Sequence, residues 1–218
     1  MSAGVSVGGL APRLSAILLT LLAAPAAAQI DPGDPIEGTF PGRVLQQVVI
    51  DAGAELGGLI ADGEQFGRAI ASLGDLDGDG VEDLVAASRS AAPEESIEGT
   101  GADGVNGPFA QGALWVLFLN ANGSLRAHQK IGMGAGGFVG PLDDTDEFGS
   151  SVANIGDLDG DGVVDLAVGA RRTDDGGNNR GAVWILFMNT DGTVKAEQKI
   201  SSLEGGFLPG PNNQDEFG

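Results

Sequence analysis

The sequence predicts an all-β fold, and glycine content, the spacing of helix-breaking residues and internal repetition all point to it. Glycine accounts for 38 of the 218 residues, roughly 17% against an average of about 7%. Hydrophobic residues still make up 42% of the chain, enough for a core. Past the N-terminus, no stretch without Gly or Pro exceeds 12 residues. Since Gly and Pro cost about 1 and 3 kcal/mol in a helix interior, short strands joined by tight turns are favoured over helical bundles, coiled coils and doubly wound α/β folds.

The chain is strongly acidic. It carries 31 acidic and 11 basic residues, for a formal net charge of −20 at pH 7. Binding of nucleic acid requires a basic surface, so a nucleic-acid partner is excluded. The same charge disfavours attachment to anionic membrane surfaces and favours the binding of cations.

The N-terminus has the pattern of a secretory signal peptide. Arg13 precedes an apolar run at 14–24, and Ala26 and Ala28 form the small-x-small pattern of a cleavage site. A membrane anchor needs about 20 apolar residues, more than this run supplies, and no other stretch could span a bilayer. We therefore expect cleavage after Ala28 and a secreted, extracellular or periplasmic location. Because the sequence has no cysteine, bound metal is a candidate for stabilising the exported chain.

Internal repetition is the dominant feature of the sequence. Segments 66–84 and 148–166 match at an offset of 82 positions, and both begin with Phe-Gly. Segments 112–120 and 181–189 match at an offset of 69. The difference corresponds to a polar, Gly-rich insertion of 13 residues in the first copy, within 89–111. We expect this insertion to form a surface loop.

The register of the repeat extends outward from these copies. Gln47, Gln129 and Gln198 each lie 19 residues before a Phe-Gly pair. We therefore expect an array of repeats with further units beyond Gly218. The expected divisions are a signal peptide at 1–28, an N-terminal segment at 29–65 with the tail strand of a preceding unit, repeats at 66–147 and 148–216, and the start of a third at 217–218.

Each repeat is expected to form four strands, which in the second copy are 150–155, 165–171, 182–188 and 193–200. The first two flank an acidic loop. The third is almost continuously apolar, which is typical of a strand buried on both faces. In the fourth, Val194, Ala196 and Ile200 alternate with Lys195, Glu197 and Lys199, as in a half-solvated strand.

Turn signals join the last two strands of each copy. Segments 120–123 and 189–192 end in Asn-Gly and Asp-Gly, which are strong hairpin signals. Four antiparallel strands in each repeat predict the blades of a β-propeller. A β-sandwich is the alternative, and the fixed period favours the propeller.

Two acidic loops share the pattern D-x-D-x-D-G-x-x-D: the first acidic loop (75–83) and the second acidic loop (157–165). Calcium takes six to eight oxygen ligands at about 2.3–2.6 Å. Carboxylates at positions 1, 3 and 5 of a tight loop converge, and Gly80 and Gly162 at position 6 allow the sharp turn. Position 7 can offer its backbone carbonyl, and the aspartate at position 9 closes the shell.

The sequence therefore predicts two Ca²⁺ sites. Their candidate ligands are Asp75, Asp77, Asp79, Val81 and Asp83 in the first loop, and Asp157, Asp159, Asp161, Val163 and Asp165 in the second. A solvated acidic turn is the alternative, but four neighbouring carboxylates without a cation would repel one another. A helical EF-hand is excluded, because its position 12 needs a glutamate and these loops have Ala86 and Val168 there.

The order Phe-Gly, then Gly-Asp-Leu-Asp-Gly-Asp-Gly-x-x-Asp-Leu, then Val168-Gly169-Ala170 closely resembles the FG-GAP repeat of the integrin alpha-chain N-terminal β-propeller. The resemblance covers roughly 47–218. It implies a ring that usually has seven blades, with calcium between the first two strands of a blade. That role would fall to the eight aspartates of the two loops.

This chain departs from the family pattern in two respects. The Gly-Ala-Pro of the family is Gly169-Ala170-Arg171 in one copy and Ala87-Ser88-Arg89 in the other. This difference keeps the strand but alters the turn. In addition, two full repeats cannot close a ring by themselves.

No catalytic constellation is evident in the sequence. His128 is the only histidine, and the G-x-S-x-G at 4–8 and the G-x-G-x-x-G at 132–137 lack the strand and helix context of those motifs. We expect a non-catalytic, secreted, calcium-binding module for adhesion, with an extracellular protein or glycan as partner. The alternatives are a lectin-like module, with Trp115 or Trp184 as a sugar platform rather than core, and an accessory domain of a longer secreted enzyme.

Overall fold

The computed structural model describes residues 16–19, 47–51, 56, 60, 64–88, 111–208 and 210–218. Of the expected signal peptide, only 16–19 falls in this part; the cleavage site and the insertion at 89–110 lie outside the described residues. The described residues contain no helix, and hence none long and apolar enough to cross a membrane.

Strands form all of the regular structure in the described part of the chain. They are β1 (Ala16–Leu19), β2 (Val48–Asp51), β3 (Ile70–Gly74), β4 (Asp83–Ser88), β5 (Ala113–Leu119), β6 (Leu125–Gly132), β7 (Phe148–Gly156), β8 (Asp165–Ala170), β9 (Ala182–Met188) and β10 (Val194–Ile200). The prediction of an all-β fold is confirmed.

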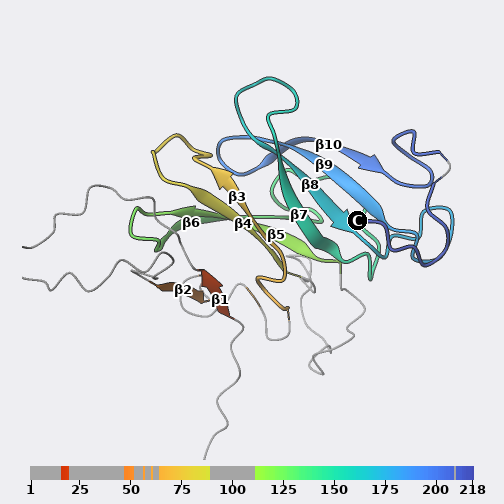
Figure 1. Cartoon of the computed structure of the whole chain (residues 1–218), viewed down its shortest axis with the longest axis horizontal. Helices are drawn as coiled ribbons and strands as arrows, with labels where there is room; N and C mark the ends of the chain where they lie inside the picture. The colour runs from red at the N-terminus through yellow and green to blue at the C-terminus, as the bar shows by residue number, and fades with distance from the viewer. Residues whose placement is uncertain are drawn as a thin grey trace, which may run out of the picture.

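The strands assemble into two four-stranded antiparallel sheets and one separate pair (Figure 1). The first sheet has the order β3-β4-β5-β6 and is called the first blade below. The second has the order β10-β9-β8-β7 and is called the second blade. β1 pairs with β2 in a two-stranded antiparallel sheet. Each blade is a meander in which consecutive strands are neighbours, the arrangement of propeller blades.

The expected strands of the second repeat agree with the structure to within two residues at each end. β9 has the expected bounds, while β7 begins earlier than expected, because Phe148 already pairs with Ala170 of β8. The two hairpin turns are also present. Gly123 N–H donates to the Asn120 carbonyl at 2.8 Å, and Gly192 N–H donates to the Asn189 carbonyl at 3.0 Å.

A β-bulge interrupts the fourth strand of the first blade. Phe118 of β5 pairs with Ala127 of β6. The next pair is Leu119 with Leu125, so Arg126 is the extra residue between two paired positions. A bulge of this kind bends the strand and changes where its side chains point.

The equivalent bulge in β10 falls between Val194 and Ala196 and makes Lys195 the extra residue. A shift by one residue exchanges the two faces of a strand. The alternation predicted for this strand is therefore wrong beyond the bulge. Lys199, expected on the solvated face, is only 6% exposed, and Ala196, expected on the buried face, is exposed.

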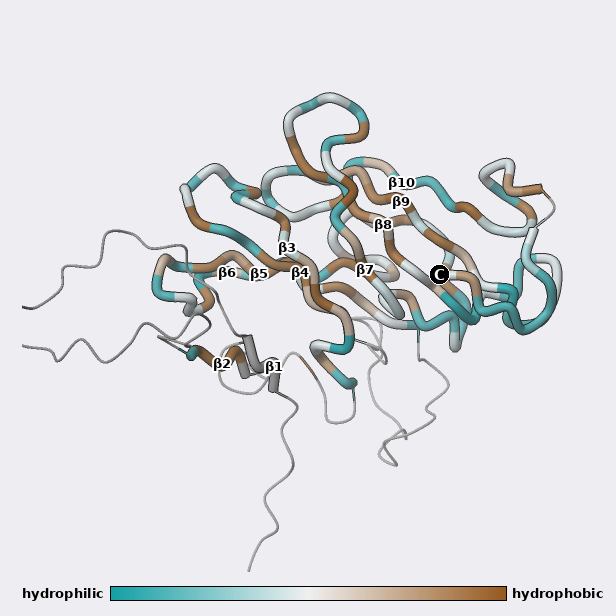
Figure 2. Tube along the Cα trace, viewed as in Figure 1, coloured by the Kyte–Doolittle hydropathy of each residue, from teal (hydrophilic) through white to brown (hydrophobic). Residues whose placement is uncertain are grey.

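The main core lies between the two blades. Leu114, Val116 and Phe118 of the first blade and Trp184, Leu186 and Met188 of the second all belong to one buried cluster. Phe138, between the blades in sequence, packs edge-on against Trp184 with the ring centroids 5.1 Å apart. Figure 2 shows hydrophobic residues along the strands and hydrophilic residues on many connecting loops.

A second core covers the opposite face of the first blade. Ile50 of β2 and Phe66 contribute to it, together with Trp115 and Leu117 of β5. Both tryptophans are thus buried, which favours the core interpretation over a sugar platform. Each lies beneath a lysine ammonium of its own blade: Lys130 Nζ is 5.7 Å from the Trp115 ring centroid, and Lys199 Nζ is 5.3 Å from that of Trp184.

The two blades differ in how their equivalent faces are covered. β5 is buried throughout, whereas burial alternates along β9. The prediction of a strand buried on both faces, made for 182–188, is therefore wrong for β9, although the equivalent β5 is fully buried. Leu76 is 5% exposed, and its equivalent Leu158 is 58% exposed. The cause is that the second blade covers the first, while no described segment covers the far face of the second in the same way.

The last residues of the chain contact the second blade as the start of β7 contacts the first. Phe148 N–H donates to the Gln111 carbonyl at 2.8 Å, and Phe217 N–H donates to the equivalent Arg180 carbonyl at 3.0 Å. Phe217 also forms a parallel bridge with Gly181. The division of the chain at 217–218 remains a prediction.

Candidate metal centre

The two acidic loops occupy the same place in the two blades. The first acidic loop connects β3 to β4 and the second connects β7 to β8. Both therefore lie between the first and second strands of a blade, where the sequence resemblance placed them. The aspartate at position 9 of each loop is already the first residue of the following strand.

Hydrogen bonds to the first aspartate fold each loop back on itself. Asp75 Oδ2 accepts from Gly80 N–H at 2.9 Å, and Asp157 Oδ2 accepts from Gly162 N–H at 2.8 Å. Gly80 and Gly162 have φ values of +89° and +90°. Residues with a Cβ disfavour positive φ values of this size, and glycine does not. The structure thus agrees with the expectation that glycine at position 6 permits the turn.

The aspartate at position 9 is fully buried and ties its loop to the third strand. Asp83 Oδ2 accepts from Leu76 N–H at 3.1 Å, and its Oδ1 accepts from Leu119 N–H at 3.0 Å. Asp165 binds the equivalent N–H groups of Leu158 and Met188. Burial raises the pKa of Asp83, while the hydrogen bonds from Leu119 and Leu76 act against that rise.

Three carboxylates converge in each loop. Oxygens of Asp75, Asp77 and Asp83 all lie within 4.8 Å of one another, and so do those of Asp157, Asp159 and Asp165. Ligands at about 2.3–2.6 Å from a Ca²⁺ ion are separated by distances of this order. The donors are all hard oxygens. The residues therefore fit a calcium ion at positions 1, 3 and 9.

The position-5 aspartates, Asp79 and Asp161, are outside these two groups of three. Asp79 Oδ1 accepts from Val81 N–H at 2.9 Å, and Asp161 Oδ1 accepts from Val163 N–H at 2.9 Å. In each loop the position-7 residue thus supports the position-5 carboxylate through its N–H. The calcium role that we predicted for these four residues remains a prediction.

Sequence reasoning missed a basic residue at each loop. Arg126 forms ion pairs with Asp77 and Asp79, and Lys195 forms ion pairs with Asp159 and Asp161. Hydrogen bonding to Asp159 and then Asp161 raises the pKa of Lys195. A signal was available in the repeat, because Arg126 and Lys195 are equivalent at the offset of 69.

The fold and the loops together define a class: a repeat protein of four-stranded propeller blades, each with an acidic loop between its first two strands. Residues 148–186 match the family model described as FG-GAP repeat. The chain thus contains an FG-GAP repeat, and the match begins at the first residue of β7.

Similarity to integrin alpha chains extends over more of the sequence. The chain is 33% identical to integrin alpha-4 of Xenopus laevis over 150 residues, which are 65% of this chain and 13% of that protein. It is 30% identical to integrin alpha-PS5 of Drosophila melanogaster over 177 residues, 81% of this chain and 14% of the relative. It is also 30% identical to integrin alpha-PS2 of the same organism over 146 residues, 65% of this chain and 9% of the relative. The chain therefore spans a small part of these relatives.

Proposed function

We propose that the chain is a secreted, calcium-binding propeller module without catalytic activity, which takes part in adhesion or extracellular protein interaction. The observation that carries the calcium assignment is the repeated convergence of three carboxylates, one set in each blade. The adhesion role rests on the similarity to integrin alpha chains. The proposed repeats are 66–147 and 148–216.

Calcium in this proposal stabilises the fold. Four aspartates lie within each nine-residue loop, and a bound cation offsets the mutual repulsion of their carboxylates. Only the folded loop holds these oxygens together, so binding favours the folded state. The test is calorimetric titration of the metal-free protein beside thermal unfolding. We expect two sites with Kd on the order of 10⁻⁶ to 10⁻³ M and a higher Tm. An unchanged Tm in millimolar calcium, or an equal response to magnesium, contradicts the proposal.

We also propose that the far face of the second blade receives a further blade of the same kind. Leu158, Ile155 and Phe207 are exposed there, whereas their equivalents Leu76, Leu73 and Phe138 are buried beneath the second blade. A chain extended by one further repeat unit should reduce the solvent exposure of the Leu158 and Phe207 side chains, which covalent side-chain labelling in solution measures. Unchanged labelling of both side chains would contradict the proposal.

Secretion is tested by N-terminal sequencing of the exported protein. The first residue should be Gln29 or one within a few positions of it, because the cleavage pattern ends at Ala28. A mature protein that retains 1–28 would reject the signal peptide.

A further inference from the structure

A basic side chain reaches each acidic loop from the fourth strand of the same blade. Arg126 and Lys195 are the extra residues of the bulges in β6 and β10. Bulges occur where a strand must redirect a side chain. The same device, at the same place in both blades, brings a cation to both loops.

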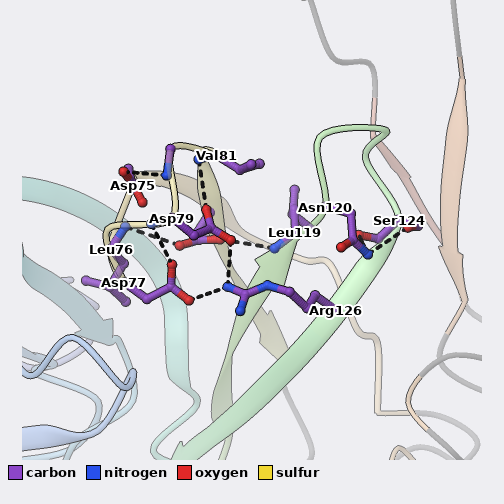
Figure 3. Close-up of polar contacts among 11 residues, drawn as sticks. Asp75, Leu76, Asp77, Asp79, Val81, Leu119, Asn120, Ser124 and Arg126 are labelled. Carbon is purple, nitrogen blue, oxygen red and sulfur yellow. Dashed lines mark hydrogen bonds and ion pairs between the residues drawn. The ribbon is translucent and has the colours of Figure 1, made fainter.

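In the first blade, the Arg126 guanidinium bridges the carboxylates at positions 3 and 5 (Figure 3). Its Nη2 contacts Asp77 Oδ2 and lies 3.0 Å from Asp79 Oδ2. The guanidinium carbon also lies over the Phe118 ring, 5.7 Å from its centroid, so that the aromatic face contacts the Arg126 side chain. All three charged groups are partly exposed, so the contact can open without breaking the core.

In the second blade, the ammonium group of Lys195 makes the contacts that the Arg126 guanidinium makes in the first. Its Nζ lies 2.8 Å from Asp159 Oδ2 and also contacts Asp161 Oδ2. Positions 3 and 5 are thus the paired carboxylates in both loops. The carboxylates at position 1 and at the buried position 9 accept backbone hydrogen bonds, as the position-5 carboxylates also do.

We propose that Arg126 and Lys195 are tethered counter-cations, which hold the carboxylates at positions 3 and 5 when metal is absent and which calcium must displace. The inference rests on the proposed calcium function. A bound Ca²⁺ would share the position-3 carboxylate with the side-chain cation. Two positive charges so close together repel, and one of them must withdraw. Each basic residue therefore lowers the calcium affinity of its own loop and limits carboxylate repulsion in the metal-free loop.

The test uses the full chain with the substitutions Arg126→Gln and Lys195→Gln, titrated with calcium in a calorimeter. Each should tighten one site by about three- to tenfold, since surface ion pairs of this kind are weak individually, and leave the other site unchanged. Lys130→Gln is the matched control. It removes one positive charge from β6, the strand that holds Arg126, at a position over the Trp115 ring. It should change neither site by more than about twofold.

A second readout does not depend on calcium affinity. In chelator, Arg126→Gln should lower the Tm, because Asp77 and Asp79 lose their counter-charge. The increase in Tm on adding calcium should then be larger than in the wild type. Arg126→Lys should keep both properties close to those of the wild type.

The outcomes separate the inference from the proposed function. If the wild type binds calcium and Arg126→Gln binds it equally or more weakly, the inference is wrong and the calcium function stands. If only the variants bind calcium, the inference stands and the calcium function of the wild type is wrong. If no protein binds calcium, both are wrong.

Discussion

Arg171 Nε lies 2.8 Å from Oε2 of Glu147, a carboxylate that is only 1% exposed. Glu147 directly precedes β7 and Arg171 directly follows β8. The same carboxylate also lies 3.4 Å from Arg68 of the first blade and 3.2 Å from Arg172. One buried anion therefore joins the entry of the second blade to both the exit of β8 and the first blade.

Replacing Glu147 by glutamine should lower the free energy of unfolding by about 2–4 kcal/mol, because a buried ion pair that loses one partner leaves charge uncompensated. Glutamine is compatible with the backbone, since Gln65 occupies the equivalent position with φ +52° against +56° for Glu147. Denaturant unfolding measures the loss. The control is Glu216→Gln at the next equivalent position, 39% exposed, where we expect less than about 1 kcal/mol. Equal effects would show that Glu147 has no special role.

Gly112 should not tolerate alanine. A Cβ at this position would lie 1.9 Å from the Phe148 carbonyl oxygen, where the second blade begins. We expect Gly112→Ala to cost about 3 kcal/mol or more, because backbone on both sides would have to separate. Gly206→Ala is the control, since its φ of +72° imposes similar backbone strain without a neighbour within 4 Å; it should cost about 1 kcal/mol. Thermal unfolding of both variants makes the comparison. Equal losses of stability would show that backbone strain alone causes the effect at Gly112.

Stability should depend on pH through Asp146. Burial raises the pKa of this side chain from 3.8 to about 6, with the positive charge of Lys199 acting in the opposite direction. Between pH 3.8 and about pH 6, the Asp146 carboxyl is therefore more protonated in the folded chain than in the unfolded chain. The contribution of Asp146 to stability is therefore fully favourable below about pH 4 and is lost as the pH rises through 6.

Asp146→Asn should consequently raise the free energy of unfolding at pH 7 by about 1–2 kcal/mol. It should also flatten the fall in stability between pH 4 and 6. The amide oxygen can still accept the hydrogen bond from Asp143 N–H, which measures 3.1 Å in the wild type. Unfolding measured over this pH range, with the exposed Asp215→Asn as a charge-matched control, tests the assignment. If the free energy of unfolding of Asp146→Asn falls between pH 4 and 6 as steeply as that of the wild type, Asp146 is not the cause of the pH dependence.

Asp159→Ala should weaken calcium binding at the second site and leave the first largely intact, because the two loops belong to different blades. One of two calorimetric transitions should be lost or shifted to at least tenfold weaker affinity, as expected when a charged ligand is removed. Asp77→Ala is the reciprocal variant for the first site. Loss of both sites in either variant would mean that the loops are coupled or that calcium binds elsewhere.

Much of the fold could be predicted from the sequence, because the repeat fixes the register of equivalent strands. The bounds of β9 followed from an unbroken apolar run between Gly181 and Asn189. The turn glycines and the spacing of the acidic loops also depend only on local sequence. These features could be predicted since each is determined within a few residues.

Features that depend on distant residues could not be predicted. Lys199 has the pattern of a solvated position, and only the bulge at Lys195 makes it face Trp184. Burial of β9 on one face depends on which segment covers it, and an apolar pattern does not contain that information. Glu147 lies beside a charged run, yet its three arginine partners come from two blades.

The position of one buried tryptophan in each blade has a practical consequence for following the folding of this chain. The protein has two tryptophans and no tyrosine, and each indole is buried in its own blade. Intrinsic fluorescence therefore contains one emitter per blade, with no background from other strong emitters. Trp115→Phe and Trp184→Phe would each leave a single reporter, so that the order in which the blades unfold could be recorded without any added dye.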